Sequence, residues 1–95
     1  MLNKNNTLKL ANYVLKRYEQ SDSLYYFYNA KSDKCWKCNE TIGSVIEVLN
    51  GTLCFTEIVE ILAENNPDTT KQEIANILEY AFTFLLEEEF IVYSN

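Results

Sequence analysis

Cys35 and Cys38 form the one arrangement in this sequence that has the spacing of a metal or redox site. A CxxC pair can share a zinc ion or form a small disulfide. On a β-strand, however, residues i and i+3 point to opposite faces, and Cys54 is the only further cysteine. Histidine, the commonest metal ligand, is absent. We therefore expect reduced strand cysteines and no cofactor. A thiol or metal protein is the weaker alternative.

Residues that could catalyse a reaction are few. Glu87, Glu88 and Glu89 stand together at the end of a predicted helix, where the helix dipole disfavours negative charge, so they are more typical of a solvated or partner-facing patch than of an acid and base pair. The chain has only two glycines and therefore lacks a glycine-rich phosphate loop. We expect no enzyme activity.

The first half of the chain is predicted to form strands. Alternating and aromatic residues over about 13–19, 24–28 and 34–38 are separated by turn-forming residues at 20–23 and 29–33. Such short connections predict an antiparallel meander of three strands. Trp36 and Cys38 are expected to face the helices that follow. Residues 1–9 carry no clear period, and we expect them to be flexible.

The second half is predicted to form three helices. The first begins after Asn39, a favourable N-cap, carries the apolar residues Ile42 to Leu49 at helical spacing and ends at Gly51. The second covers about 55–65. The third begins at Thr70, which forms a capping box with Glu73, and runs to about residue 88. The 95 residues thus form one α+β domain, a three-stranded antiparallel sheet followed by three helices.

The third predicted helix has more apolar surface than a core requires. At ~100° per residue, one stripe runs from Ile74 to Leu85, and Ile77, Tyr80 and Phe84 lie beside it. Together they cover more than twice the ~100° that is usual for a surface helix. We expect the second stripe to form a groove for a partner, because few residues are left to cover it.

Charge is distributed unevenly along the chain. The net charge is −6, but residues 1–39 carry seven basic and three acidic residues, and residues 40–95 carry one basic and eleven acidic residues. This asymmetry indicates either a charged partner or only different solvated residues on sheet and helices. No apolar run is long enough to span a bilayer, and the N-terminus lacks the apolar region of a secretory signal, so we expect a cytoplasmic protein.

A winged helix-turn-helix that binds DNA is the main alternative function, because it also combines three helices with a small sheet. Its third helix would enter the DNA groove. Between Gln72 and Glu89, however, that helix has five glutamates and no basic residue, whereas contact with phosphates requires positive charge. We therefore expect no nucleic acid partner.

Three segments resemble the PqqD-like family, whose members recognise precursor peptides for enzymes that modify ribosomally made peptides. The segments are Lys-Cys-Trp-Lys-Cys-Asn-Glu-Thr at 34–41, Ile-Glu-Val-Leu-Asn-Gly at 46–51 and Thr-Glu-Ile-Val at 56–59. The resemblance covers about residues 13–91. Cys38 stands where the family usually has Leu, Cys54 near a usual Thr, and Glu89 where Gly is common.

The resemblance implies a winged helix-turn-helix-like domain without enzyme activity. It implies that the leader segment of a precursor peptide binds as an added strand on the edge of the third strand, in a groove against the third helix, and that a peptide-modifying enzyme is the second partner. From the lack of a spanning apolar run we expect no membrane partner. We expect Lys34 and Lys37 to attract an acidic leader. The expected leader-binding residues are Lys34, Cys35, Trp36, Lys37, Cys38, Ile77, Tyr80 and Phe84.

Overall fold

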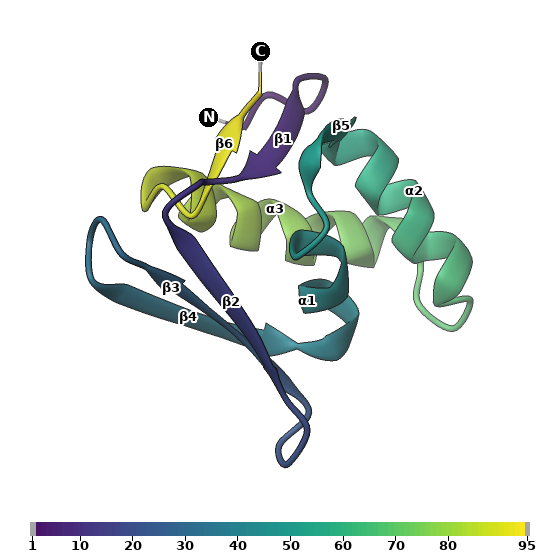
Figure 1. Cartoon of the computed structure of the whole chain (residues 1–95). Coiled ribbons are helices and arrows are strands. Elements are labelled where there is room, and N and C mark those ends of the chain that lie inside the picture. The colour runs from purple at the N-terminus through teal and green to yellow at the C-terminus, as the bar shows by residue number, and fades with distance from the viewer. Residues whose placement is uncertain (1, 95) are drawn as a thin grey trace.

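The computed structural model describes residues 2–94 and has an α+β fold (Figure 1). Within these residues the elements follow in the order β1 (Thr7–Leu10), β2 (Val14–Glu19), β3 (Leu24–Asn29), β4 (Lys34–Asn39), α1 (Glu40–Ile46), β5 (Asn50–Cys54), α2 (Phe55–Asn65), α3 (Lys71–Glu87) and β6 (Ile91–Tyr93).

The strands form two antiparallel sheets. Sheet B has the order β2-β3-β4 and is the predicted meander, with Tyr25 opposite both Tyr18 and Cys38. Sheet A has the order β5-β1-β6 and was not predicted. The predicted order of three strands followed by three helices is therefore wrong in detail, because β1 precedes the meander, β5 lies between α1 and α2, and β6 follows α3.

The first helix is shorter than predicted. Asn39 caps it as expected, since its Oδ1 accepts from the N–H of Ile42 at 2.9 Å. The helix ends at Ile46, however, and not at Gly51. Leu49 still reaches the core, through a tight turn in which its N–H donates to the carbonyl of Ile46 at 3.2 Å. Gly51 has a φ of 94° within β5, so its left-handed conformation serves an irregular strand and not a helix end.

The N-terminal segment also departs from the prediction. Residues 7–10, which overlap the end of the segment 1–9 that was expected to be flexible, form β1, and Leu8 is fully buried. β1 pairs with β5 on one side and with β6 on the other, so both ends of the chain join one sheet (Figure 1). Met1, which belongs to the same expected flexible segment, lies outside the described residues.

Helices α2 and α3 agree with their predicted ranges. The capping box at the start of α3 is present, because Thr70 accepts from the N–H of Glu73 at 3.1 Å and the Glu73 carboxylate accepts from the N–H of Thr70 at 3.4 Å. No helix within residues 2–94 is both long enough and apolar enough to cross a membrane.

The core lies between the two sheets and the helices. Gly43 allows α1 to lie directly on sheet B, since a Cβ at this position would come within 2.4 Å of the Tyr25 ring. The buried apolar residues come from both sheets, all three helices and their connections: Leu8, Ala11, Val14, Phe27, Ile46, Leu49, Phe55, Ile58, Val59, Leu62, Ile74, Leu78, Phe82, Leu85, Phe90 and Ile91.

Candidate functional site: the face between α3 and β4

Strand β4 offers an unpaired edge. It is the last strand of sheet B, and within residues 2–94 no strand pairs with its outer side. In an antiparallel sheet, alternate residues of an edge strand direct their N–H and C=O groups away from the neighbouring strand. These groups can pair with an additional strand. β4 can therefore accept an extended peptide through main-chain hydrogen bonds.

The two faces of β4 have different surroundings. Trp36 and Cys38 are partly buried and pack against the core, as predicted, and the Trp36 ring centroid lies 6.1 Å from that of Phe27. Cys35 is exposed and lines a hollow on the opposite face of sheet B. By the alternation of the strand, Lys37 shares that outer face. Only part of the predicted strand segment thus faces α3.

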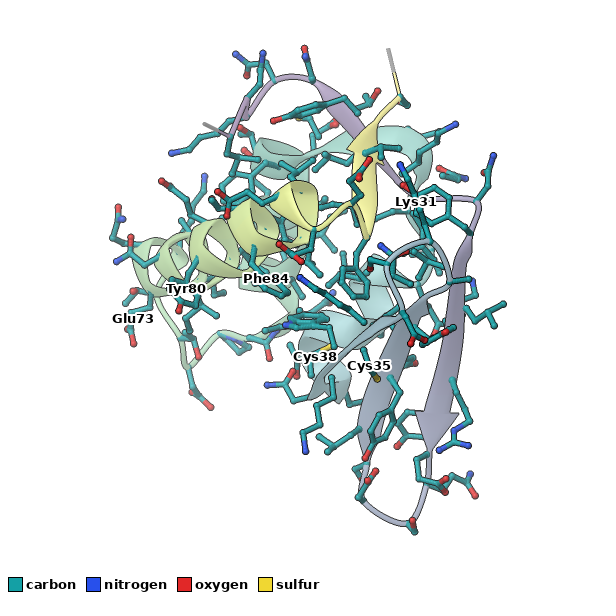
Figure 2. All side chains as sticks on the ribbon, turned by 90° about the vertical axis from the view of Figure 1, so that its left-hand side faces the viewer. Lys31, Cys35, Cys38, Glu73, Tyr80 and Phe84 are labelled. Carbon is teal, nitrogen blue, oxygen red and sulfur yellow. The ribbon has the colours of Figure 1, made fainter. Side chains whose placement is uncertain are left out.

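Helix α3 has the two apolar stripes that its sequence predicts. The first stripe, which includes Ile74 and Leu85, is buried in the core. The second is open: 54% of Ile77, 85% of Tyr80 and 38% of Phe84 is exposed. Figure 2 shows Tyr80 and Phe84 projecting from α3 on the side where Cys38 of β4 lies. These three side chains form an apolar surface that the described residues do not cover.

Helix α3 and strand β4 run side by side in opposite directions. Lys34 at the start of β4 forms an ion pair with Glu88 at the end of α3. Asn39 at the end of β4 lines one cavity together with Ile77 of α3. The strand from 34 to 39 spans ~17 Å at ~3.3 Å per residue, and the helix from 77 to 88 spans ~17 Å at ~1.5 Å per residue. The two elements are therefore antiparallel, and the lengths of strand and helix between these two points match (Figure 1). We call the β4 edge with Ile77, Tyr80 and Phe84 the α3–β4 face.

Two cavities lie along this face. A cavity of about 510 Å³ follows the outer side of α3, and both polar and apolar residues line it: Asn76, Glu79, Tyr80, Thr83, Phe84 and Glu87. A smaller cavity of about 230 Å³ lies where β4 ends and has both polar and apolar lining residues: Asn39, Thr41, Ile42, Leu62, Asn66, Thr69, Ile74 and Ile77.

Asn29 holds one end of the face together. It is fully buried at the end of β3, and its Nδ2 donates to the carbonyls of Glu88 at 2.9 Å and Glu89 at 3.3 Å. Its Oδ1 accepts from the N–H groups of Lys31 at 2.9 Å and Ser32 at 3.1 Å. One amide thus ties the β3–β4 turn to the C-terminus of α3. It sets the separation of the two elements at this end.

The thiols on β4 differ in reactivity. Burial raises the pKa of Cys38 to about 12, so this thiol is protonated at neutral pH and is a poor nucleophile. Cys35 lies on the other face of the same strand and is exposed. No group of three or more potential metal-ligating side chains exists within residues 2–94. The α3–β4 face therefore presents apolar side chains and free main-chain groups of β4, and neither thiol of β4 is an activated nucleophile by these observations.

The structure brings six of the eight predicted residues to the α3–β4 face, namely Lys34, Trp36, Cys38, Ile77, Tyr80 and Phe84. The other two, Cys35 and Lys37, lie on the outer face of sheet B. Lys34 is engaged with Glu88 and is not a free cation.

Asn29 was missed as a positioning residue. Its sequence position identifies only a turn-forming residue, and its partners in α3 lie about 60 positions further along the chain. The polar lining of the smaller cavity was missed for the same reason, since this lining combines residues that are far apart in the chain.

Comparison with models of known protein families, with curated proteins and with solved structures gave no match.

Proposed function

We propose that this chain is a peptide-recognition domain that binds an extended peptide as an added strand on β4, against the open side of α3. One observation carries the proposal: the unpaired edge of β4, ~17 Å long, lies opposite a side of α3 whose exposed apolar residues, Ile77 to Phe84, extend over ~10.5 Å. Strand addition supplies affinity through main-chain hydrogen bonds, and neighbouring side-chain pockets supply specificity. A stretch of ~17 Å accommodates five or six extended residues.

The ligand that we propose is the leader segment of a ribosomally made precursor peptide. This follows from the resemblance of residues 34–41, 46–51 and 56–59 to the PqqD-like family. In that role α2, α3 and the β3–β4 hairpin correspond to a winged helix-turn-helix-like unit. The domain holds the leader so that the rest of the precursor reaches a modifying enzyme at high effective concentration, and it performs no chemistry itself.

The first test is titration of the isotope-labelled protein with the N-terminal half of a short precursor peptide encoded near its gene, followed by NMR. We expect the amide shifts to concentrate on β4 and on residues 77–84. Strand addition also predicts slower amide exchange at alternate residues of β4, because only every second N–H faces the added strand. Shifts restricted to the outer face of sheet B would contradict this binding mode.

Substitutions identify the side chains that contact the peptide. Tyr80→Ala removes a ring that is 85% exposed, so the fold should lose less than ~0.5 kcal/mol of stability. If a peptide covers ~80 Å² of the ring, the binding free energy should weaken by ~2 kcal/mol, a loss of about thirtyfold in affinity. Leu15→Ala is the matched control, because Leu15 is an exposed apolar residue on the opposite face of sheet B. Equal effects of the two substitutions would refute the assignment.

Phe84 requires a milder substitution. Its ring stacks on that of the buried Phe90 with centroids 6.4 Å apart, so Phe84→Ala would also disturb packing. Phe84→Leu retains apolar volume and should weaken peptide binding about threefold to tenfold with a smaller effect on stability.

DNA binding is disfavoured by the surface of α3. Its exposed side carries Glu79 and Glu87 beside Tyr80, and the only basic residue in the helix is Lys71 at its first position. If this chain binds duplex DNA with an affinity that falls steeply as the salt concentration rises, the proposed function is wrong and the chain is a winged-helix regulator.

A further inference from the structure

The C-terminal end of α3 carries unbalanced negative charge beside the apolar face. Lys34 pairs with Glu88, and Lys31 pairs with Glu89 at 3.0 Å. Glu87 is exposed and has no ion-pair partner within residues 2–94. No basic residue lies in the last turn of α3, and the carbonyls at a helix C-terminus add partial negative charge. A cation is therefore favoured at Glu87.

Glu87 belongs to the same side of α3 as the apolar residues. It follows Tyr80 by seven positions, close to two full helical turns, so the two side chains are aligned along the helix. Both residues line the cavity of about 510 Å³, together with Phe84. A peptide that contacts Tyr80 and Phe84 thus passes within reach of the Glu87 carboxylate.

The spacing along α3 predicts a pattern in the peptide. Measured from Ile77 along the helix axis, Tyr80 lies at ~4.5 Å, Phe84 at ~10.5 Å and Glu87 at ~15 Å. Side chains on one face of an extended strand recur every ~6.7 Å. The first such side chain then packs between Ile77 and Tyr80, the second between Tyr80 and Phe84, and the third lies beside Glu87.

We infer that the bound peptide segment has the pattern apolar–x–apolar–x–Lys or Arg, and that its basic side chain pairs with Glu87. This inference rests on the proposed function. The order follows from direction. All strand pairs within residues 2–94 are antiparallel, and we take the added strand to pair with β4 in the same way. Such a strand runs in the same direction as α3, because β4 and α3 are themselves antiparallel. The basic residue must therefore follow the two apolar ones. This differs from the acidic leader expected from Lys34 and Lys37, since Lys34 is paired and Lys37 lies on the other face of sheet B.

Three synthetic peptides blocked at both ends test the inference. They share the neutral flanks and contain Leu-Thr-Leu-Thr-Lys, Leu-Thr-Leu-Thr-Glu or the reversed order Lys-Thr-Leu-Thr-Leu. Calorimetric titration should show the first binding about fivefold more tightly than the other two, as an exposed ion pair allows. The preference over the acidic peptide should shrink between ~0.05 M and ~0.5 M salt, because exposed charges are screened.

A charge reversal assigns the effect to Glu87. Glu87→Lys should make the acidic peptide the tighter ligand; a mirrored preference of about fivefold corresponds to a change of about twenty-five-fold in the ratio of the two affinities. Glu64→Lys is the matched control, because Glu64 is an exposed acid on α2 and the substitution changes the net charge equally. The control should leave the ratio unchanged.

The outcomes separate this inference from the proposed function. If a peptide binds, Tyr80→Ala weakens it and Glu87→Lys leaves the charge preference unchanged, the basic pattern is refuted and peptide binding at the α3–β4 face stands. If none of the three peptides binds, the pattern is also refuted. The proposed function fails only if, in addition, the precursor titration shows no binding at β4 and residues 77–84.

Discussion

The side chain of Asn29 should contribute more to stability than any other polar side chain near the α3–β4 face. Asn29→Ala removes four hydrogen bonds, two to the carbonyls of Glu88 and Glu89 and two from the N–H groups of Lys31 and Ser32. At ~1 kcal/mol each these sum to ~4 kcal/mol. Water can reach the exposed turn and replace some of the lost hydrogen bonds, so we expect a decrease of ~2–3 kcal/mol in the free energy of unfolding.

Asn29→Asp separates the two halves of this contribution. A carboxylate still accepts from the N–H groups of the β3–β4 turn, but it cannot donate to the carbonyls of α3. It also places a negative charge beside the acidic end of that helix. We therefore expect Asn29→Asp to destabilise the protein by ~2 kcal/mol and to weaken peptide binding, because α3 is released from the hairpin.

Urea unfolding followed by the fluorescence of Trp36, the only tryptophan, measures both variants. Trp36 packs against the core and therefore reports its opening. Asn12→Ala serves as the control, since Asn12 is exposed in the connection between β1 and β2. If both Asn29 variants unfold within ~0.5 kcal/mol of the unchanged protein and bind peptide equally well, Asn29 does not join the hairpin to α3, and our account of the face is wrong.

Three further predictions follow from the geometry. Alkylation at neutral pH should label Cys35 well before Cys38, because Cys35 is exposed and burial holds the pKa of Cys38 at about 12; mass spectrometry of the modified peptides shows the order. The hydrogen-bonded Glu47 carboxylate and burial raise the pKa of Tyr25 to about 12, and burial raises the pKa of Cys38 to about 12. Because both folded-state pKa values lie above the ordinary values, the stability that these protonated groups contribute should be complete below pH ~9 and should decline as the pH rises toward ~12. Thermal melts across that pH range measure this decline. Glu89→Gly should raise the free energy of unfolding by up to ~1 kcal/mol, because Glu89 has a φ of 62° at the end of α3, where glycine is unstrained; a loss of stability in urea titration would contradict this.

The sequence predicted the elements whose signals are local. The strands of sheet B and helices α2 and α3 occur within a few residues of their expected ranges, because each carries its own alternation, helical period or cap. The open apolar side of α3 was equally predictable, since it follows from the positions of Ile77, Tyr80 and Phe84 on a helix. These features depend on residues that are close together in the chain.

Sheet A shows why the remainder of the fold was not predictable. Residues 50–54 have no strand period, and the apolar spacing that ends at Leu49 continues that of a helix. They become β5 only because β1, more than 40 positions earlier, pairs with them. β1 and β6 are similarly short and stabilise each other across the full length of the chain. Pairing between distant segments leaves no periodic signal within either one.

The sequence by itself therefore determined the strands of the meander, helices α2 and α3, and which side of α3 is apolar. The tertiary structure alone decided where α1 ends, that β4 and α3 run antiparallel, that Lys37 and Cys35 face away from α3, and that Asn29 joins the β3–β4 turn to the C-terminus of α3. The physical reason is the range of the interactions. Side-chain periodicity and capping act over a few residues, whereas strand pairing and the bonds of a buried amide depend on which distant groups the folded chain brings within ~3 Å.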